Sequence, residues 1–177
     1  MVIHRGQVDK DVKYLVNDIR QVMEPFTAAS LKVTKKNSLK DFVGIAGPLH
    51  VTHLIVLTQT DVGDYMKLIR VPRGPTIHFR LVDYSLVNDV LAVQRKKHTH
   101  KKQFLYQPLL ILNGFSLRKE EDLNQAHAKM EPQLKLLATA LQNMFPSINI
   151  TKVNLNDIRR CVLFNYNKED QTIDFRQ

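Results

Sequence analysis

Two parts of this chain repeat one order of sequence signals, and the repeat restricts the possible folds more than any other feature. In the first, a predicted helix ends at Met23-Glu24-Pro25, and a polar link leads to Ser38-Leu39-Lys40-Asp41-Phe42. In the second, a predicted helix ends at Met144-Phe145-Pro146 and leads to Asn154-Leu155-Asn156-Asp157-Ile158. Each pentad precedes a pair of predicted strands. This order predicts an α/β (α+β) fold with a duplicated unit, whose two copies pack about a pseudo-twofold axis.

The elements of the first copy follow from hydrophobic periodicity and from residues that stop helices. Apolar residues at helical spacing predict a helix over residues 10–24, which Pro25 ends. Ser38 is expected to cap a short helix, with the carboxylate of Asp41 near its first amides. Alternating apolar residues separated by turns predict three strands, over residues 52–60, 65–71 and 76–84.

The remaining elements are predicted in the same way. Apolar residues at helical spacing favour helices, and apolar runs bounded by turn residues favour strands. In order, we expect a helix capped by Ser85, a short buried strand, a polar loop, a second helix and a strand pair, over residues 86–96, 108–115, 116–129, 133–145 and 161–177.

The positive charge of the chain is concentrated in its first part. The net charge is +9, and residues 1–106 hold 17 Lys and Arg against 9 Asp and Glu, a net charge of +8. Residues 107–177 hold 9 against 8. A charge of this size favours a polyanionic partner, most commonly nucleic acid. The sequence therefore predicts a basic half over residues 1–106 and a half over 107–177 suited to core packing and protein contact.

Clustered cations are the candidate contacts for this polyanion, because Lys and Arg can neutralise phosphates and release counterions. Arg70 and Arg73 flank a Gly-Pro turn, whose stiffness would leave little entropy to lose on binding. The alternative for each cluster is a solvated surface. The candidate RNA-binding residues are Lys32, Lys35, Lys36, Lys40, Arg70, Arg73, Arg95, Lys96, Lys97, Lys101, Lys102, Arg159 and Arg160.

Signals for catalysis, metals and membranes are missing from the sequence. The single cysteine, Cys161, lies in an apolar run and is expected to be a small core residue. His50 and His53 lack the glutamate of the metalloprotease motif, and His98 and His100 lie among lysines that oppose a cation. Nucleophile elbows, nucleotide-binding loops and membrane-spanning apolar runs are also absent. We therefore expect no enzyme activity, no cofactor or metal, no small-molecule substrate and no membrane partner.

Seven short segments resemble the Brix-domain superfamily, and within it the Peter Pan branch. The resemblance runs in one order over nearly the whole chain. The segment Asn37 to Val43 and the sequence Gly47-Pro48-Leu49 with Val51-Thr52-His53 point to that branch. The other segments are Met23 to Ala28, Gly74-Pro75-Thr76, Tyr84-Ser85-Leu86, Pro108-Leu109-Leu110 and Asn143 to Pro146.

The resemblance implies one Brix domain over residues 1–177, with two similar halves that each resemble an anticodon-binding domain. It also implies a nucleolar, non-catalytic factor that binds precursor rRNA and other assembly factors in early precursors of the large ribosomal subunit. Gly74, Pro75 and Thr76 would then be structural, leaving Arg70 and Arg73 as contacts.

The chain also departs from the family pattern. Family members continue past the position of Gln177 with a segment that completes the domain, and they carry basic tails. We therefore expect a fragment that is incomplete at its C-terminus and has an unpaired strand edge in its second half. An alternative function is a protein-interaction module, whose basic patches bind acidic segments of partners instead of RNA.

Overall fold

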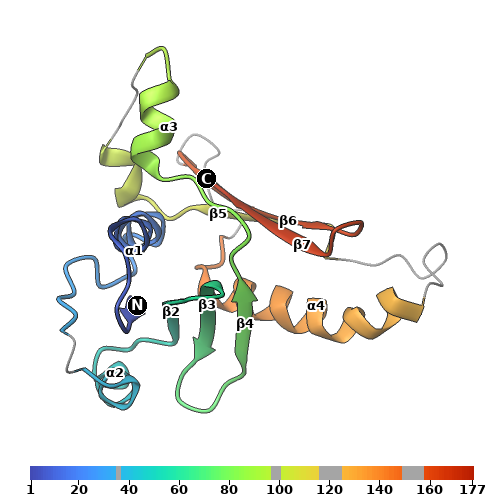
Figure 1. The fold of residues 1–177 in the computed structure, drawn as a ribbon, viewed down its shortest axis with the longest axis horizontal. Helices are drawn as coiled ribbons and strands as arrows, with labels where there is room; N and C mark the ends of the chain where they lie inside the picture. Colours follow the sequence, from blue (N-terminus) through green and yellow to red (C-terminus); the bar gives the residue numbers. More distant parts are fainter. Residues whose placement is uncertain (35–36, 97–100, 116–124, 149–157) are drawn as a thin grey trace. The chain divides into compact units, whose positions relative to one another are not determined.

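The chain forms two compact units, Met1–Leu105 (unit 1) and Tyr106–Gln177 (unit 2) (Figure 1). This division lies beside residue 106, where the charge balance changes. The computed structural model describes residues 1–34, 37–96, 101–115, 125–148 and 158–177.

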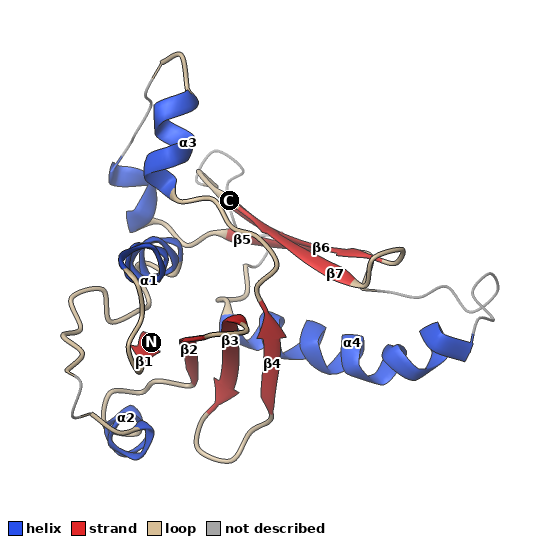
Figure 2. Cartoon of the chain, in the orientation of Figure 1, coloured by secondary structure: helices blue, strands red, loops and turns tan. Residues whose placement is uncertain are grey.

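Unit 1 contains one four-stranded sheet and most of the helices of the described chain (Figure 2). Its elements are β1 (Val2–Arg5), α1 (Lys10–Val22), α2 (Leu39–Ala46), β2 (His53–Thr60), β3 (Gly63–Arg70), β4 (Thr76–Arg80), α3 (Val87–Val93) and the 3₁₀ helix η1 (Lys101–Leu105). Unit 2 contains a three-stranded sheet and one long helix. Its elements are β5 (Leu109–Asn113), α4 (Gln125–Met144), β6 (Cys161–Asn167) and β7 (Thr172–Arg176).

Both units repeat one order of strand pairing. In unit 1, β1 pairs in parallel with β2, which pairs in antiparallel with β3. In unit 2, β5 pairs in parallel with β6, which pairs in antiparallel with β7. In the sequence, α1 and α2 lie between the parallel strands of unit 1, and α4 lies between those of unit 2, since parallel neighbours need a long crossover connection. The shared order fits the duplication that the sequence predicts, and the twofold relation between the copies stays a prediction.

Helices lie on both faces of the unit 1 sheet at its β1–β2 end (Figure 1). On one face, α1 buries Val12, Val16 and Ile19, and the Arg20 Nε donates to the carbonyl of Val2 at 3.0 Å. On the other face, Phe42 of α2 packs in a core cluster with Met1, Ile3, Leu54 and Val56. The first five residues of β2 are consequently buried on both faces.

The predicted ends of the first two helices agree closely with the structure. Helix α1 ends at Val22, two residues before the predicted end, because a residue that precedes proline disfavours helical geometry. Helix α2 begins after Ser38, as predicted, and Ser38 and Asp41 have the arrangement of a capping box. The backbone N–H of Ser38 donates to the Asp41 carboxylate at 2.8 Å.

The prediction for α3 was wrong in its cap and its length. Its N-cap residue is Leu86, and the amide of Val87 donates to the Asp18 carboxylate of α1 at 3.0 Å. Asp18 thus supplies the side-chain acceptor expected from Ser85. The helix ends at Val93 because Gln94 takes an extended conformation, so Arg95 and Lys96 lie beyond it.

Helix α4 begins earlier than predicted. It runs through Pro132, which removes one helical hydrogen bond without ending the helix. Residues 125–129, expected to lie in a loop, are therefore helical, whereas residues 116–124 lie outside the described chain.

Burial in unit 2 alternates along β6. Val162, Phe164 and Tyr166 of β6 are buried, and Phe164 contacts Phe145 edge-on with ring centroids 6.2 Å apart. Cys161 is exposed, so its assignment to the core was wrong: it faces the opposite side of the sheet from Val162. Strand β5, predicted to be buried, has only half-buried and exposed residues.

Candidate nucleic-acid interface

The turn between β3 and β4 holds two of the candidate arginines. Arg70 and Arg73 are both exposed. The amide of Gly74 donates to the carbonyl of Arg70 at 3.0 Å, and the amide of Arg70 donates to that of Pro75 at 3.1 Å. A Cβ at position 74 would lie 2.3 Å from the Cβ of Arg70, so only glycine fits there. The stem of Arg70 therefore lies against Gly74, which restricts where its guanidinium group can reach.

His53 lies directly opposite Arg70 in the β2–β3 pairing, and its ring is buried. The Oγ1 of Thr52 lies 2.9 Å from its Nδ1. Burial lowers the pKa of His53 below its usual value of 6.5, and the positive charge of Arg70 lowers it further. Both effects favour the neutral form of the His53 ring. No metal-binding group of three His, Cys, Asp or Glu occurs among the described residues.

We expect the stability of unit 1 to fall as the pH drops below about 6.5. The pKa of His4, like that of His53, is lowered by burial, and further by Lys13 and Arg20. Between the folded and unfolded pKa values the unfolded chain binds more protons, so acid favours unfolding. Urea midpoints at pH 7.5 and 5.5 measure the effect. A unit 1 midpoint that does not fall at pH 5.5 would contradict the prediction.

The cations near α2 lie beside one hydrophobic cluster. Leu31, Val33 and Leu39 pack against the core formed by Phe42 and its neighbours, whereas Lys32 and Lys40 are exposed. The structure therefore brings Lys32 and Lys40 to the rim of this cluster. Lys35 and Lys36 lie outside the described residues.

The cations after α3 are exposed where the structure describes them. Arg95 and Lys96 follow the end of the helix, and Lys102 lies in η1. Lys97 and the side chain of Lys101 lie outside the described chain, as do His98 and His100.

The last two candidates belong to unit 2, and they differ from each other. The guanidinium of Arg159 lies 5.2 Å from the centroid of the Tyr106 ring, and Arg159 is exposed. Arg160 is buried, and its Nε donates to the Tyr106 carbonyl at 3.0 Å. Arg160 thus links the start of unit 2 to the residue before β6. Its listing as a candidate RNA contact is therefore corrected: its role is structural.

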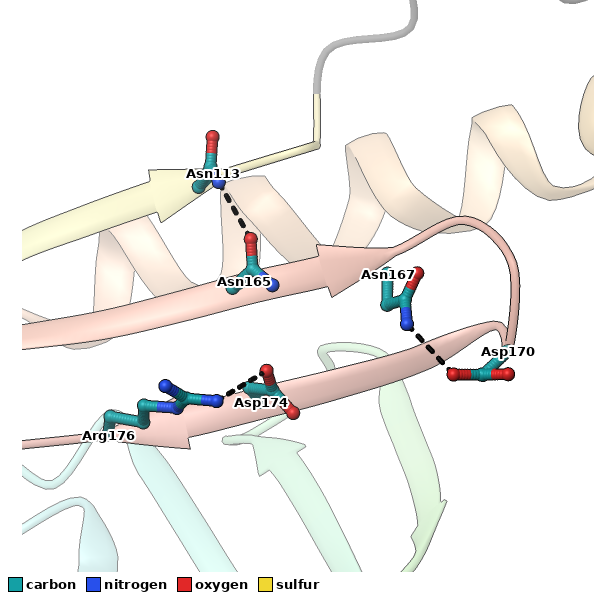
Figure 3. A network of polar contacts seen from close by, with 6 residues as sticks. All are labelled: Asn113, Asn165, Asn167, Asp170, Asp174 and Arg176. Atoms are coloured by element: carbon teal, nitrogen blue, oxygen red, sulfur yellow. Dashed lines mark hydrogen bonds and ion pairs between the residues drawn. The ribbon is translucent and has the colours of Figure 1, made fainter.

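Polar side chains along the strands of unit 2 and in the β6–β7 turn form hydrogen-bonded pairs (Figure 3). The Nδ2 of Asn113 donates to the Oδ1 of Asn165 at 2.7 Å. Arg176 pairs with Asp174 at 3.1 Å. The cation among these residues, Arg176, is therefore paired with a carboxylate.

Three cations of unit 1 were missed because they stand alone in the sequence. Arg5, Lys67 and Arg80 belong to no basic run. They lie in strands, and the pairing register puts them on one face of the sheet. The only sequence signal for them is the alternation within each predicted strand, which cannot say which strands are neighbours.

No helix among the described residues has the length and apolar composition needed to span a bilayer.

Comparison with known proteins gives a consistent set of relatives. A family model described as "Brix domain" matches residues 6–177. "Suppressor of SWI4 1 homolog" of Mus musculus is 48% identical over 178 residues, covering 99% of this chain and 35% of the relative.

Two further relatives come from other organisms. "Protein Peter pan" of Drosophila melanogaster is 38% identical over 175 residues, covering 99% of this chain and 35% of its own length. "Ribosome biogenesis protein SSF2" of Saccharomyces cerevisiae is 40% identical over 182 residues, covering 99% of this chain and 40% of its own length. The chain thus spans between a third and about two fifths of the length of these relatives.

Proposed function

This chain belongs to the Brix-domain family, in its Peter Pan branch, and from that membership we propose that it is a ribosome biogenesis factor for the large subunit. The family resemblance of the sequence is thereby confirmed. In the proposed role the chain binds precursor rRNA and other assembly factors in early particles of the nucleolus. It holds RNA in position without making or breaking bonds, and it needs no cofactor.

The charge of residues 1–106 is the observation that carries the RNA-binding part of this proposal. Their net charge of +8 includes cations that the structure leaves exposed, at the rim of the α2 cluster, in the β3–β4 turn and after α3. Exposed cations can neutralise RNA phosphates, and the resulting counterion release favours binding. The chain has few aromatic residues on which bases could stack, so its shape and charge are suited mainly to contacts with the RNA backbone.

The test is RNA affinity as a function of salt concentration. We expect Lys32→Ala/Lys40→Ala and Arg95→Ala/Lys96→Ala each to lower the slope of log K against log salt by about 1.4–1.8, the value for two lost phosphate contacts. Lys10→Ala/Lys13→Ala, which removes two exposed cations from α1, is the matched control and should keep the native slope. If the native chain shows no RNA affinity at low salt, the RNA-binding proposal fails.

Contact with another protein is a second candidate function, and helix α3 favours it. None of its residues is buried, and Val87, Val90 and Val93 are exposed, Val93 to 88%. Apolar residues left uncovered on a short helix favour burial against a partner. A protein complex that survives RNase and is lost in Val90→Ser/Val93→Ser would support this function. RNase treatment also tests whether the basic patches bind acidic protein segments instead of RNA, because such a protein complex would survive the treatment.

A further inference from the structure

One face of the unit 1 sheet carries a row of polar side chains that crosses all four strands. The pairing register aligns Arg5 of β1 with Thr58 of β2, Thr58 with Tyr65 of β3, and Tyr65 with Arg80 of β4. Residues directly opposite each other share a face of the sheet. The neighbouring row on the same face places Lys67 beside His78. We call these six residues the open face: Arg5, Thr58, Tyr65, Lys67, His78 and Arg80.

On this side of the sheet, the cluster under helix α2 includes Leu54, Ile3 and Val56. It reaches the row of Lys67, because Val56 lies directly opposite Lys67, but it does not include the row of Arg5, Thr58, Tyr65 and Arg80. Arg5, His78 and Arg80 are exposed, and Thr58, Tyr65 and Lys67 are half-buried. Along β4 the open-face residues are the exposed ones, whereas Ile77 and Phe79, on the opposite face, are half-buried. The open face is therefore accessible to a partner from solvent.

Charge is sorted between the two faces at this end of the sheet. No strand residue on the open face is a carboxylate, and no ion pair joins its cations to acids in the described part of unit 1. Asp64 belongs to the opposite face. Burial raises the pKa of Tyr84, and the negative charges of Asp64, Asp11 and Asp9 raise it further. Because successive strand residues alternate in direction, Asp64 and Tyr65 are separated by the sheet itself. The open face thus has an uncompensated positive charge.

The side chain of Arg80 lies beside Gly63 at the β2–β3 turn. The Nε of Arg80 lies 3.9 Å from where a Cβ of Gly63 would be. The guanidinium group therefore extends beside the β2–β3 turn, and no side chain at Gly63 stands between it and solvent. Arg5 lies three strand spacings away in the same row, about 14 Å, with Tyr65 between them.

We propose that the open face binds single-stranded RNA, with Arg5, Lys67 and Arg80 on phosphates and the ring of Tyr65 against an unpaired base. This assignment rests on the proposed RNA-binding function and names its surface. An aromatic ring between cations offers both stacking and charge neutralisation, which is the chemistry that single strands use. A duplex hides the faces of its bases, so the Tyr65 ring would gain nothing from it. An acidic peptide would use the cations alone.

The test compares labelled oligouridylate with an RNA duplex of the same length, on the whole chain. We expect Arg5→Gln/Arg80→Gln to lower the salt slope for oligouridylate by about 1.4, since two phosphate contacts are lost. Tyr65→Leu should weaken oligouridylate binding by about 5- to 100-fold and leave duplex binding unchanged, whereas Tyr65→Phe should bind like the native chain. Lys10→Gln/Lys13→Gln is the charge-matched control on α1, and it should keep the native slope. All these side chains are at least partly exposed, and circular dichroism verifies the fold of each variant.

Each other outcome overturns a defined part of the assignment. If the native chain binds oligouridylate and Arg5→Gln/Arg80→Gln keeps its slope, the open face is not the site, and the proposed function stands on the other clusters. If the arginine variant loses affinity but Tyr65→Leu does not, or if Tyr65→Leu weakens duplex binding equally, the single-strand assignment is wrong. If the native chain binds no RNA at low salt, both the open face and the proposed RNA binding are refuted. Binding of oligoglutamate that competes equally well would assign the face to an acidic peptide.

Discussion

We expect Leu54→Ala to lower the free energy of unfolding of unit 1 by about 2–5 kcal/mol. Leu54 is 0% exposed and packs between Ile3, Val56 and Phe42 in the core cluster under α2. Removing its branched end takes away buried apolar surface and leaves a cavity, because a β-sheet with helices on both faces cannot close around the gap. The loss of unfolding free energy should lie in the upper half of this range, since β2 is buried on both faces at Leu54.

Chemical denaturation monitored by hydrogen exchange of the β2 and β3 amides measures this loss for unit 1 by itself. Leu49→Ala is the matched control, because Leu49 is 57% exposed and should change stability little. Equal losses for Leu49→Ala and Leu54→Ala would show that the core is not where the structure places it. The β6 amides of unit 2 serve as an internal reference.

The second large effect is expected in unit 2. Gly114→Ala should destabilise this unit by about 2–4 kcal/mol, from backbone strain and a steric clash together. Gly114 follows β5 with a φ of +77°, in the left-handed region that favours glycine. A Cβ there would lie 2.5 Å from the carbonyl oxygen of Tyr166, and backbone of a central strand cannot move aside as a flexible side chain does.

Hydrogen exchange of the β6 amides measures this loss in the whole chain. Gly44→Ala is the matched substitution, since Gly44 lies in helix α2 and a Cβ built there would meet no atom within 4 Å apart from its chain neighbours and the nearby backbone of the helix. Alanine there should stabilise α2 by up to about 1 kcal/mol, because glycine is a poor helix former. An unchanged β6 exchange rate in Gly114→Ala would mean that the chain leaves β5 along a different path.

Local signals in the sequence were sufficient for most of the elements. Periodicity and Pro25 located α1, and the Ser38–Asp41 pair located α2 with its capping box. Turn residues separated β2, β3 and β4. These features depend on residues within a few positions of one another, so the sequence carries them without knowledge of the fold. The family follows from short segments in a fixed order, and the comparisons confirm it.

The clusters of cations were a weaker guide to the candidate site. Runs such as Arg95-Lys96 are visible in the sequence and are exposed in the structure, but the sequence could not show that Arg160 is buried against the Tyr106 carbonyl. Whether a cation is free depends on which backbone groups surround it, and those groups come from a segment more than fifty residues away.

Which residues share a face of a sheet or a helix cap depends on the tertiary structure and could not be predicted from local sequence patterns. Asp18 caps α3 from another helix, and Cys161 points away from the core although its neighbours in the sequence are apolar. Arg5, Tyr65 and Arg80 lie in one row because β1 pairs with β2, β2 with β3 and β3 with β4 in particular registers. A shift of one residue in any pairing would send those side chains to the opposite face. Register is set by packing across the whole sheet, so local patterns give the strands, and tertiary structure gives the surface that they build.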